Sequence, residues 1–422
     1  MRVAVITDTL RPNGANIMAV ESAGLLADNG HEVLLLSGSR PDPSIERRLV
    51  GRRHRAFLAE DSVLDYTTGA QRQELARAME RWVTEQLAEL RPDVVVCHNT
   101  GRLLDQLAVA RVSQAFPVVV YLHDEWFLTD QHYVTDPASP HQTLYEPFRA
   151  KSARDHDFSG LWQVPGTAGT LCAVAPSRWL VERWRQVFPS LACGLVHNPV
   201  SPELFDLVDR AEARAVLGLA DDVEVVGFVG APRQRRKGFE LLTEAVASLP
   251  ERDRPFVLAA GGPTSSAGHR VAARLGASGL VAERLRSSGA PAHVPGAAPA
   301  ETLVLSGVPR ASFKHVYGAM DLLVHPSRIE NLPTVPIEAT YCGTPCLVSD
   351  VGGSEEVVSA RAELVPGDQT PRALAARIRA ALDRARSEPN ELRSERRSAA
   401  LARFSPEQHY LQLLPILESA AA

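Results

Sequence analysis

Short apolar runs alternate along the chain with longer stretches whose apolar residues recur at helical spacing. The runs are rich in valine, leucine and isoleucine, which is typical of strands in a parallel sheet. Strands that alternate with amphipathic helices predict the α/β class. In the first half of the chain we expect strands at 3–7, 32–36, 93–97, 117–122 and 171–175, and helices at 17–29 and near 74–90.

The same pattern starts again in the second half of the chain. We expect strands at 224–229, 256–260, 322–324 and 346–348, and a helix at about 239–248. The segment 261–300 is longer than a normal connection, and we expect a helix at about 271–286 in it. The sequence therefore predicts two doubly wound domains that meet between residues 198 and 222, and residues 406–419 have the spacing of a further helix.

Composition and charge narrow the class of protein. The 422 residues exceed the roughly 250–300 that one core supports, so two domains are expected. The net charge of −5 argues against general nucleic-acid binding, which needs a basic surface. No apolar run approaches the roughly 20 residues that span a bilayer, and the first residues lead into a strand rather than a signal peptide. We therefore expect a cytoplasmic protein.

The five cysteines are scattered along the chain, at positions 97, 172, 193, 342 and 346. Only Cys342 and Cys346 are close in sequence, and no second cysteine or histidine cluster completes a zinc site. We expect buried, reduced thiols and no metal site.

The stretch from Arg328 to Glu338 carries two carboxylates eight positions apart, with a helix start between them. Eight helical residues rise about 12 Å, so Glu330 and Glu338 cannot share one ligand atom. They are placed to hold the two ends of a long ligand. The alternative is a solvated acid followed by a surface acid in a helix.

We expect Thr334 to cap this helix, with Val335 in its first turn. The free amides of Leu332, Val335 and Ile337 would then form an anion site at the helix N-terminus. Two acids on either side of an anion site are the outline of a nucleotide-sugar site, with hydroxyls at each end and a diphosphate between them.

A basic turn, from Arg233 to Gly238, follows the first strand of the second domain. Parallel sheets bind ligands at the carboxyl ends of their strands. The guanidinium of Arg236 and the ammonium of Lys237 would neutralise a diphosphate there, and a solvated turn is the alternative. The run from Gly227 to Gly230 lacks Gly-x-Gly-x-x-Gly spacing, which disfavours a nicotinamide cofactor.

Polar residues also follow three strands of the first domain. Gly14 follows the first strand and would allow a phosphate or sugar to approach the backbone closely, although most loop glycines serve only a turn. His98 with Asn99, and His123 with Asp124, follow two later strands. Each histidine is a candidate for the ligand site, and a structural role is the alternative.

A run of arginines lies between Arg47 and Arg55. It could contact an anionic acceptor or, weakly, a membrane surface. A solvated face is the favoured interpretation, because no paired apolar stripe accompanies the arginines.

Taken together, these residues resemble the retaining glycosyltransferases of family 4, and the resemblance runs essentially end to end. The segment 330–338 resembles the family's Glu-x7-Glu motif, and residues 236–238 resemble its Arg-Lys-Gly turn. Further similar segments are 321–327, 338–345, 175–177 and 197–200. The resemblance implies a GT-B fold: two Rossmann-like domains, 1–200 for the acceptor and 201–404 for the donor, facing a central cleft, with a helix in 405–422 crossing back onto the first.

The resemblance also implies roles for individual residues. Glu338 would hold the ribose of the donor, Glu330 its sugar, and Lys237 with Arg236 its diphosphate, while His123 would lie beside the transferred sugar. Because the turn is long, Arg233 would share the role of Arg236. The expected catalytic residues are His123, Glu330, Lys237 and Arg236; the expected donor-binding residues are Gly14, Arg233, Asn331, Leu332, Thr334, Val335 and Glu338; and the acceptor-side candidates are His98, Asn99 and Asp124.

The implied reaction moves a sugar from a nucleoside-diphosphate-sugar to an acceptor hydroxyl with retention, by attack on the same face of the sugar and without a cofactor or metal. The acceptor would be a small molecule, a saccharide or a lipid-linked group. The chain departs from the family pattern at Ala15, Asn331 and Pro333, where glycine is usual. The alternatives are a GT-B nucleotide-sugar epimerase or hydrolase, a phosphorylase using Lys314, and a catalytically silent nucleotide-sugar-binding protein.

Overall fold

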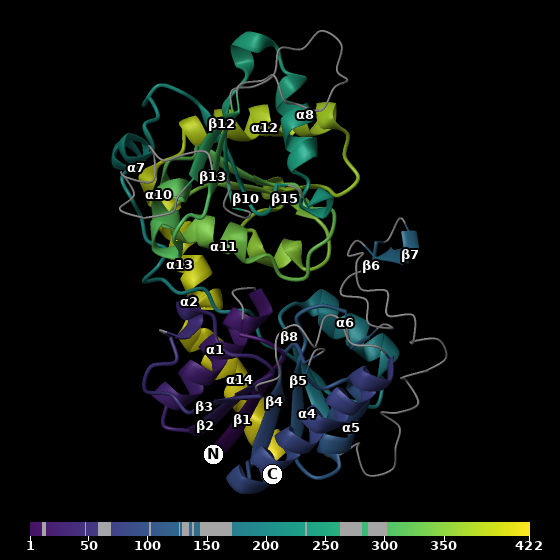
Figure 1. The fold of residues 1–422 in the computed structure, drawn as a ribbon. Coiled ribbons are helices and arrows are strands. Elements are labelled where there is room, and N and C mark those ends of the chain that lie inside the picture. Colours follow the sequence, from purple (N-terminus) through teal and green to yellow (C-terminus); the bar gives the residue numbers. More distant parts are fainter. Residues whose placement is uncertain are drawn as a thin grey trace. The chain divides into compact units, whose positions relative to one another are not determined.

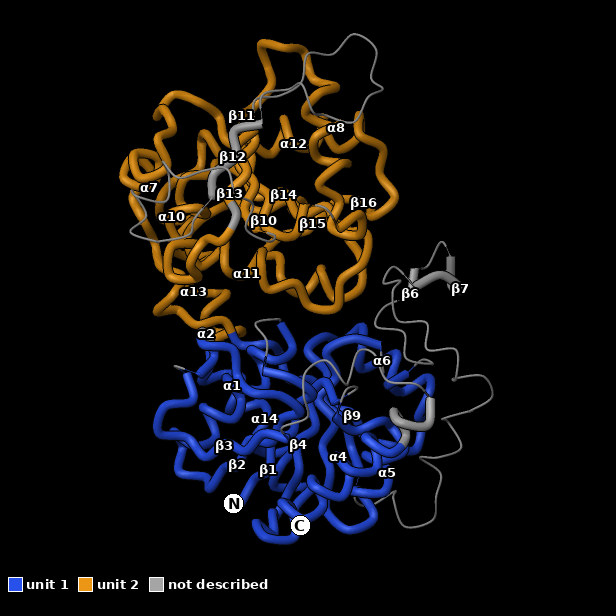
Figure 2. Tube along the Cα trace, in the orientation of Figure 1, with its two compact units in different colours: residues 1–199, 406–422 blue, residues 200–405 orange. Residues whose placement is uncertain are grey.

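The chain forms two compact units in the computed structural model, residues 1–199 with 406–422 and residues 200–405 (Figure 2). Each unit contains one seven-stranded sheet and its covering helices (Figure 1). The structure describes residues 1–10, 14–46, 48–57, 69–100, 103–125, 127–128, 135–136, 139–143, 171–232, 234–261, 281–285 and 302–422.

The sheet of the first unit has the strand order β3-β2-β1-β4-β5-β8-β9, and every described pair in it is parallel. The strand order reverses beside β1, which lies between β2 and β4. The predicted strands of this half are confirmed. The strands are β1 (Arg2–Thr7), β2 (Glu32–Ser37), β3 (His54–Ala56), β4 (Val94–Cys97), β5 (Val118–Tyr121), β8 (Leu171–Ala175) and β9 (Cys193–Leu195), with a separate pair β6 (Thr135–Asp136) and β7 (Ser139–Thr143).

Helices cover both faces of this sheet, because its strands are apolar on both sides. The C-terminal helix packs on one face, where Leu413 and Leu417 join the core formed by β1, β2 and α1. It is therefore part of the first unit. The helices are α1 (Gly14–Asp28), α2 (Pro43–Glu46), α4 (Gly69–Leu90), α5 (Gln106–Ser113), α6 (Arg178–Val187) and α14 (Pro406–Ala421).

The sheet of the second unit has the order β12-β13-β11-β10-β14-β15-β16, with β12 antiparallel to β13. The order reverses beside β10, which lies between β11 and β14. The strands are β10 (Val225–Val229), β11 (Phe256–Ala260), β12 (Val281–Leu285), β13 (Thr302–Ser306), β14 (Leu322–His325), β15 (Cys346–Asp350) and β16 (Leu364–Pro366).

The helices of the second unit cover its sheet in the same way. Among them, the short turn η2 follows β10 and the helix α11 follows β14, so both begin at the carboxyl end of a central strand. The helices are α7 (Arg210–Leu217), η2 (Arg235–Lys237), α8 (Phe239–Ala247), η3 (Glu251–Asp253), η4 (Arg310–Ser312), α10 (Phe313–Gly318), α11 (Thr334–Tyr341), η5 (Ser354–Val357), η6 (Arg361–Glu363), α12 (Pro371–Arg386) and α13 (Asn390–Phe404).

The predicted helix at 271–286 is wrong where the structure describes it. Residues Val281–Leu285 form β12, which pairs along its length with β13. Pairing with a neighbouring strand satisfies the backbone polar groups of this short segment, and such tertiary contacts override weak local helix preference. The rest of the predicted helix lies outside the described residues.

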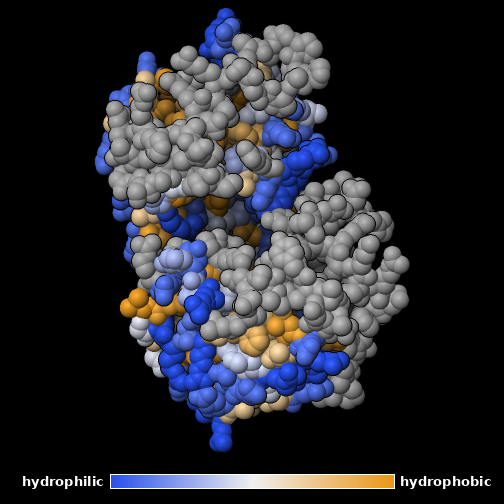
Figure 3. Space-filling model, viewed as in Figure 1, coloured by the Kyte–Doolittle hydropathy of each residue, from blue (hydrophilic) through white to orange (hydrophobic). Residues whose placement is uncertain are grey.

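No helix in the described ranges is both long and apolar enough to cross a membrane. On the face drawn in Figure 3, hydrophilic residues cover much of the described surface, and hydrophobic residues form small patches between them. All five cysteines are free thiols, of which Cys97, Cys342 and Cys346 are buried.

Candidate functional site

The predicted acid Glu330 lies beside the predicted lysine, at the carboxyl ends of the neighbouring strands β10 and β14. The Lys237 Nζ is 2.5 Å from Glu330 Oε1, and the His325 Nε2 is 3.1 Å from the same oxygen. Burial alone would raise the pKa of Glu330, but the charge of Lys237 and the hydrogen bond with His325 outweigh it and hold that pKa well below its usual range. Glu330 is therefore an ionised carboxylate in an ion pair that is largely, but not fully, buried.

The backbone clamps the basic turn onto the chain that follows β14. The amide of Arg328 donates to the Arg236 carbonyl at 2.8 Å. Gly238 has a φ of +75°, and a Cβ there would lie 2.0 Å from the carbonyl oxygen of Pro326. No other residue fits this position without a shift of the backbone. The glycine therefore brings Lys237 within reach of Glu330.

The helix α11 begins one residue earlier than predicted, and Thr334 is not its cap. Pro333 is the N-cap, with φ −72° and ψ 119°, and no side chain caps the helix. The proline ring fixes an extended residue there, so Thr334 already has helical geometry. In such a helix the free amides are those of Thr334 and Val335, whereas the amide of Ile337 is the first that can reach back to the Pro333 carbonyl. The predicted anion site is thus shifted by one residue.

The loop before α11 is held from a third strand. The amide of Gly353, in the turn after β15, donates to the Asn331 carbonyl at 2.8 Å. Leu332 next to it is buried in the core of the unit. The loop that carries Glu330 is therefore fixed on both sides, by the turns after β10 and β15.

The second predicted acid, Glu338, is also buried, with different partners. The Arg310 Nη2 donates to its Oε1 at 2.8 Å, and the Tyr317 hydroxyl donates to its Oε2 at 2.7 Å. Burial and the nearby Glu338 raise the pKa of Tyr317 well above its usual value, so the phenol keeps its proton. The Arg310 guanidinium lies 5.1 Å from the Phe205 ring centroid, and at 40% side-chain exposure it is the most exposed part of this cluster.

Arg310 and Tyr317 are contacts of Glu338 that the sequence did not predict. Both follow β13, and no strand was predicted between residues 260 and 322. Arg310 stands four residues after Ser306, the last residue of β13. Had the apolar run 302–306 been read as a strand, the rule that polar groups at strand ends form sites would have selected Arg310.

In the first unit, the two predicted histidines lie side by side after β4 and β5. The His98 Nδ1 is 3.0 Å from the His123 Nε2. Both rings stack on Tyr121, at 4.7 Å and 4.9 Å between centroids and at 12° and 18° between planes. Burial lowers the pKa of His98 well below its usual value and that of His123 to about 3. Both imidazoles are therefore neutral at neutral pH.

The other predicted residues of the first unit also lie near the carboxyl ends of its central strands. The Asn99 carbonyl accepts from the Asp8 amide at 2.6 Å, which joins the exits of β4 and β1. Asp124 is half-buried beside His123. Gly14 is the first residue of α1, and a Cβ added to it would meet no atom of the described residues within 4 Å. Packing within the unit therefore does not require glycine at position 14.

The start of α1 is pinned by the buried side chain of Asn16. Its Oδ1 accepts from the Thr7 hydroxyl at 3.1 Å, and its Nδ2 donates to the Thr9 hydroxyl at 2.8 Å. Both threonines belong to the exit of β1, so this amide fixes the helix that begins at Gly14 against the strand. The neighbouring residue 13 and Arg233 of the basic turn lie outside the described residues.

The described arginines of the basic run, on the surface of the first unit, each pair with an acid. The pairs are Arg48–Glu21, Arg52–Asp28, Arg53–Glu32 and Arg55–Glu89. These contacts neutralise the cations locally, which favours a solvated face over an anion-binding or membrane-binding surface. Arg47 lies outside the described residues.

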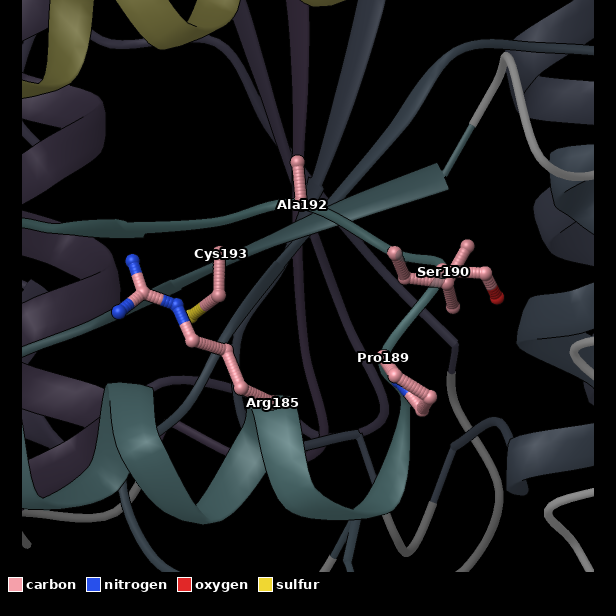
Figure 4. Close-up of a pocket in the computed structure, with 6 residues that line it drawn as sticks. Arg185, Pro189, Ser190, Ala192 and Cys193 are labelled. Carbon is pink, nitrogen blue, oxygen red and sulfur yellow. The ribbon is translucent and has the colours of Figure 1, made fainter.

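One pocket of the first unit lies away from the predicted site residues. Figure 4 shows it between the end of α6 and the sheet-edge strand β9, lined by Arg185, Pro189, Ser190, Leu191, Ala192 and Cys193. It includes none of the predicted residues, which follow central strands. Within the described ranges, no group of three or more His, Cys, Asp or Glu residues is arranged to hold a metal ion.

Two models of known protein families match the chain, one in each half. The model described as Glycosyltransferase Family 4 matches residues 12–204, and the model described as Glycosyl transferases group 1 matches residues 223–384. With the two Rossmann-like sheets, these matches define the class: the chain is a GT-B protein and belongs to the family 4 glycosyltransferases.

Two curated proteins that are similar to part of the chain are both named D-inositol 3-phosphate glycosyltransferases. The chain is 32% identical over 187 residues to the D-inositol 3-phosphate glycosyltransferase of Jonesia denitrificans, covering 43% of this chain and 40% of that protein. It is 34% identical over 197 residues to D-inositol 3-phosphate glycosyltransferase 1 of Catenulispora acidiphila, covering 44% and 43%. The matched region thus spans less than half the length of these relatives.

Solved structures resemble the chain over its whole length. HepE of Anabaena in complex with UDP has a TM-score of 0.67 at 18% identity, covering 99% of this chain and 100% of that one. A glycosyltransferase from Rickettsia africae has a TM-score of 0.69 at 13% identity, covering 99% and 98%. At these identities the likeness is one of fold.

Proposed function

We propose that the protein transfers a sugar from a nucleoside-diphosphate-sugar to an acceptor hydroxyl, with retention of configuration. The observation that carries this proposal is the buried Lys237–Glu330 pair beside the free amides of α11. A cation, helix amides and a carboxylate lie together at the carboxyl ends of the central strands of the second unit, where a parallel sheet binds ligands.

Each part of this edge suits one part of the donor. The ammonium of Lys237 has three donors, so it can hold Glu330 and a phosphate oxygen together. The amides of Thr334 and Val335 would donate hydrogen bonds to the other phosphate, and Arg236 would add positive charge. Glu330 would accept hydroxyls of the donor sugar and Glu338 those of the ribose.

The proposed reaction needs no enzyme nucleophile. The acceptor oxygen bonds to the anomeric carbon on the face from which the phosphate leaves, and the bond from that carbon to the phosphate oxygen breaks. The leaving phosphate takes the proton of the acceptor hydroxyl. Lys237, Arg236 and the α11 amides would stabilise the charge that develops on the leaving diphosphate.

A panel of nucleotide sugars tests the proposal. UDP-sugars come first, because the similar HepE structure contains UDP. Stabilisation of the purified protein by one donor, followed by mass-spectrometric detection of a glycosylated acceptor, supports the proposal. D-inositol 3-phosphate belongs in the acceptor panel because relatives are named for it. Release of nucleotide without any acceptor would favour the hydrolase or epimerase alternative instead.

The variant Lys237→Ala links the activity to the site. Loss of one charged donor at the leaving group is expected to lower turnover by about 10²–10³-fold. Lys314→Ala makes the same change outside the site and is expected to leave turnover unchanged. Folding of both variants is checked by circular dichroism. Equal turnover of Lys237→Ala and the wild type contradicts the assignment.

Metal independence is part of the proposal and has its own test. The charge that a divalent cation supplies in other phosphate sites would come here from Lys237, Arg236 and the helix amides. We therefore expect turnover to be unchanged by EDTA and not to increase with added Mg²⁺ or Mn²⁺. Loss of turnover in EDTA that Mg²⁺ or Mn²⁺ restores would show that a metal takes part.

A further inference from the structure

His98 and His123 form a hydrogen bond between two imidazoles in the first unit. Their facing nitrogens, His98 Nδ1 and His123 Nε2, are 3.0 Å apart. A neutral imidazole carries one proton on one of its two nitrogens. Since both rings are neutral, one of the facing nitrogens must donate the proton and the other must accept it. The question is which one.

The far side of His98 decides between the two arrangements. His98 is fully buried, and its Nε2 has no hydrogen-bond partner among the residues that the structure describes. If His123 donated, the proton of His98 would sit on this Nε2, as a buried N–H without an acceptor. If His98 donates, the same Nε2 is only an unused lone pair. Buried N–H groups without a partner are rarer in proteins than acceptors that lack one, so donation by His98 is favoured.

We propose that His98 is a positioning residue: it donates its Nδ1–H to the Nε2 of His123 and thereby fixes the proton of His123 on Nδ1. The backbone holds the donor ring in place, because the His98 amide donates to the Ile6 carbonyl at 2.9 Å. The Tyr121 ring beneath both imidazoles keeps them nearly coplanar, with 27° between their planes.

The consequence concerns what His123 can do in the reaction, and this step rests on the proposed function. With Nε2 occupied as an acceptor and Nδ1 protonated, neither ring nitrogen of His123 can serve as a base, and a ligand that reaches Nδ1 meets a hydrogen-bond donor. It can orient an oxygen of the transferred sugar and cannot take the proton of the acceptor. This role fits a same-face reaction in which the leaving phosphate takes that proton.

Nitrogen NMR of the histidine rings tests the tautomers directly, without substrate. The whole chain is labelled with ¹⁵N only in histidine, and ring signals are assigned by loss in His98→Phe and His123→Gln. We expect Nδ1 protonated and Nε2 unprotonated in both rings of the wild type, with an N–N coupling across the hydrogen bond. A protonated Nε2 on His123 in the wild type overturns the proposal, whatever the variants do.

Two substitutions of His98 give the matched comparison. Asn at this position places an amide N–H near the former Nδ1, so His98→Asn is expected to keep His123 in the Nδ1–H form. His98→Phe keeps a ring of similar size without a donor, and His123 is expected to shift to the Nε2–H form. A purely structural role for His98 predicts no change of the His123 tautomer in either variant, which overturns the proposal.

Turnover adds a functional readout. His98→Phe is expected to lower kcat by about tenfold with little change in KM, and His98→Asn is expected to restore most of it. Unchanged kcat in a folded His98→Phe variant whose tautomer has shifted contradicts the role of His123 as an oriented donor. If the wild type binds no nucleotide sugar at all, the proposed function fails while the NMR result still decides the tautomer.

Discussion

The two units place their candidate residues at the same point of a doubly wound sheet, but with different chemistry. In each, the strand order reverses beside the first strand, and the candidate residues follow the central strands. The second unit places an ion pair there, Lys237 with Glu330, and a second buried acid, Glu338, beside Arg310. The first unit places neutral rings there, His98 and His123 stacked on Tyr121.

The contrast teaches how one fold can divide a reaction between two halves. Charged groups held at fixed positions suit the binding of a diphosphate, because hydrogen bonds between ionised groups are stronger than those between neutral groups. Neutral imidazoles contribute little charge and instead orient hydrogen bonds. In the proposed reaction the second unit would supply affinity for the donor, whereas the first unit would orient the reacting groups.

The largest expected effect breaks the ion pair. Lys237→Met leaves the Glu330 carboxylate, whose side chain is 10% exposed, without its cation. Removal of one partner of a fully buried pair costs about 3–5 kcal/mol of stability, and because this pair is partly exposed we expect a loss of about 3 kcal/mol. We expect the double variant Lys237→Met with Glu330→Gln to recover much of this loss, since it buries no unpaired charge.

Urea unfolding with two probes measures this effect in one unit at a time. All five tryptophans lie between positions 82 and 184, so their fluorescence reports the first unit, while circular dichroism reports both. We expect the circular-dichroism transition to shift and the fluorescence transition to stay. An equal shift of both transitions would show that the two units unfold together, and their stabilities could then not be compared separately.

The next largest effect is the acid sensitivity of the first unit, through His409. This buried ring links α14 to the rest of the unit, through Ser22 and the His197 carbonyl. Burial lowers the pKa of His409 to about 4. The unfolded chain takes up a proton below about pH 6.5, whereas the folded unit does not until about pH 4. Acidification from pH 6.5 to 4.5 therefore favours unfolding, by about 2 kcal/mol.

The second unit is expected to respond differently over the same interval. The pKa of Glu330 is depressed below its usual value near 4.5, so its contribution to stability is present above that pH and is lost only as the pH falls further. Between pH 6.5 and 4.5 the tryptophan transition should thus move to lower urea and pass the second-unit transition. Burial also lowers the pKa values of His98 and His123, which contribute over the same interval. His409→Asn, which keeps a donor for the His197 carbonyl, should therefore reduce this dependence without abolishing it; an unchanged slope argues against His409.

A third test compares equivalent glycines of the two units. Gly238→Ala meets the Pro326 carbonyl at 2.0 Å and a φ of +75°, so we expect a loss of about 1–3 kcal/mol in the second unit. Gly14→Ala meets no atom in the described part of the chain and is expected to leave stability unchanged or slightly higher. If Gly14 lies against the donor as proposed, the same change should weaken nucleotide binding about tenfold, measured by calorimetry. Unchanged binding would remove Gly14 from the site.

The strands were predictable because their pattern is local, whereas the partners within the site were not. A valine-rich run such as that of β4 shows its burial in its own residues. The pairing of Lys237 with Glu330, 93 positions apart, depends on β10 lying beside β14, and strand order is not contained in any local pattern. The same limit hid Arg310 and Tyr317, because their strand was itself not predicted.

The N-cap of α11 illustrates a smaller limit. Thr334 has the right chemistry for a cap, but Pro333 before it already has the extended geometry that a cap requires. Backbone restriction by proline won over side-chain preference. The free amides moved by one residue, and the predicted site kept its place in the fold.

The smallest expected effect concerns the arginine run, whose charges the structure pairs with acids. Arg53 and Glu32 form an ion pair with side chains about half exposed, 51% and 50%. Exposed pairs contribute about 0–1 kcal/mol because water and salt screen them. We expect Arg53→Gln to leave both unfolding transitions nearly unchanged, and the whole protein not to sediment with anionic vesicles at physiological salt. If the protein binds such vesicles and Arg53→Gln weakens that binding, these arginines contact an anionic surface in addition to their acidic partners. The first unit would then carry a charged site beside its neutral histidine rings.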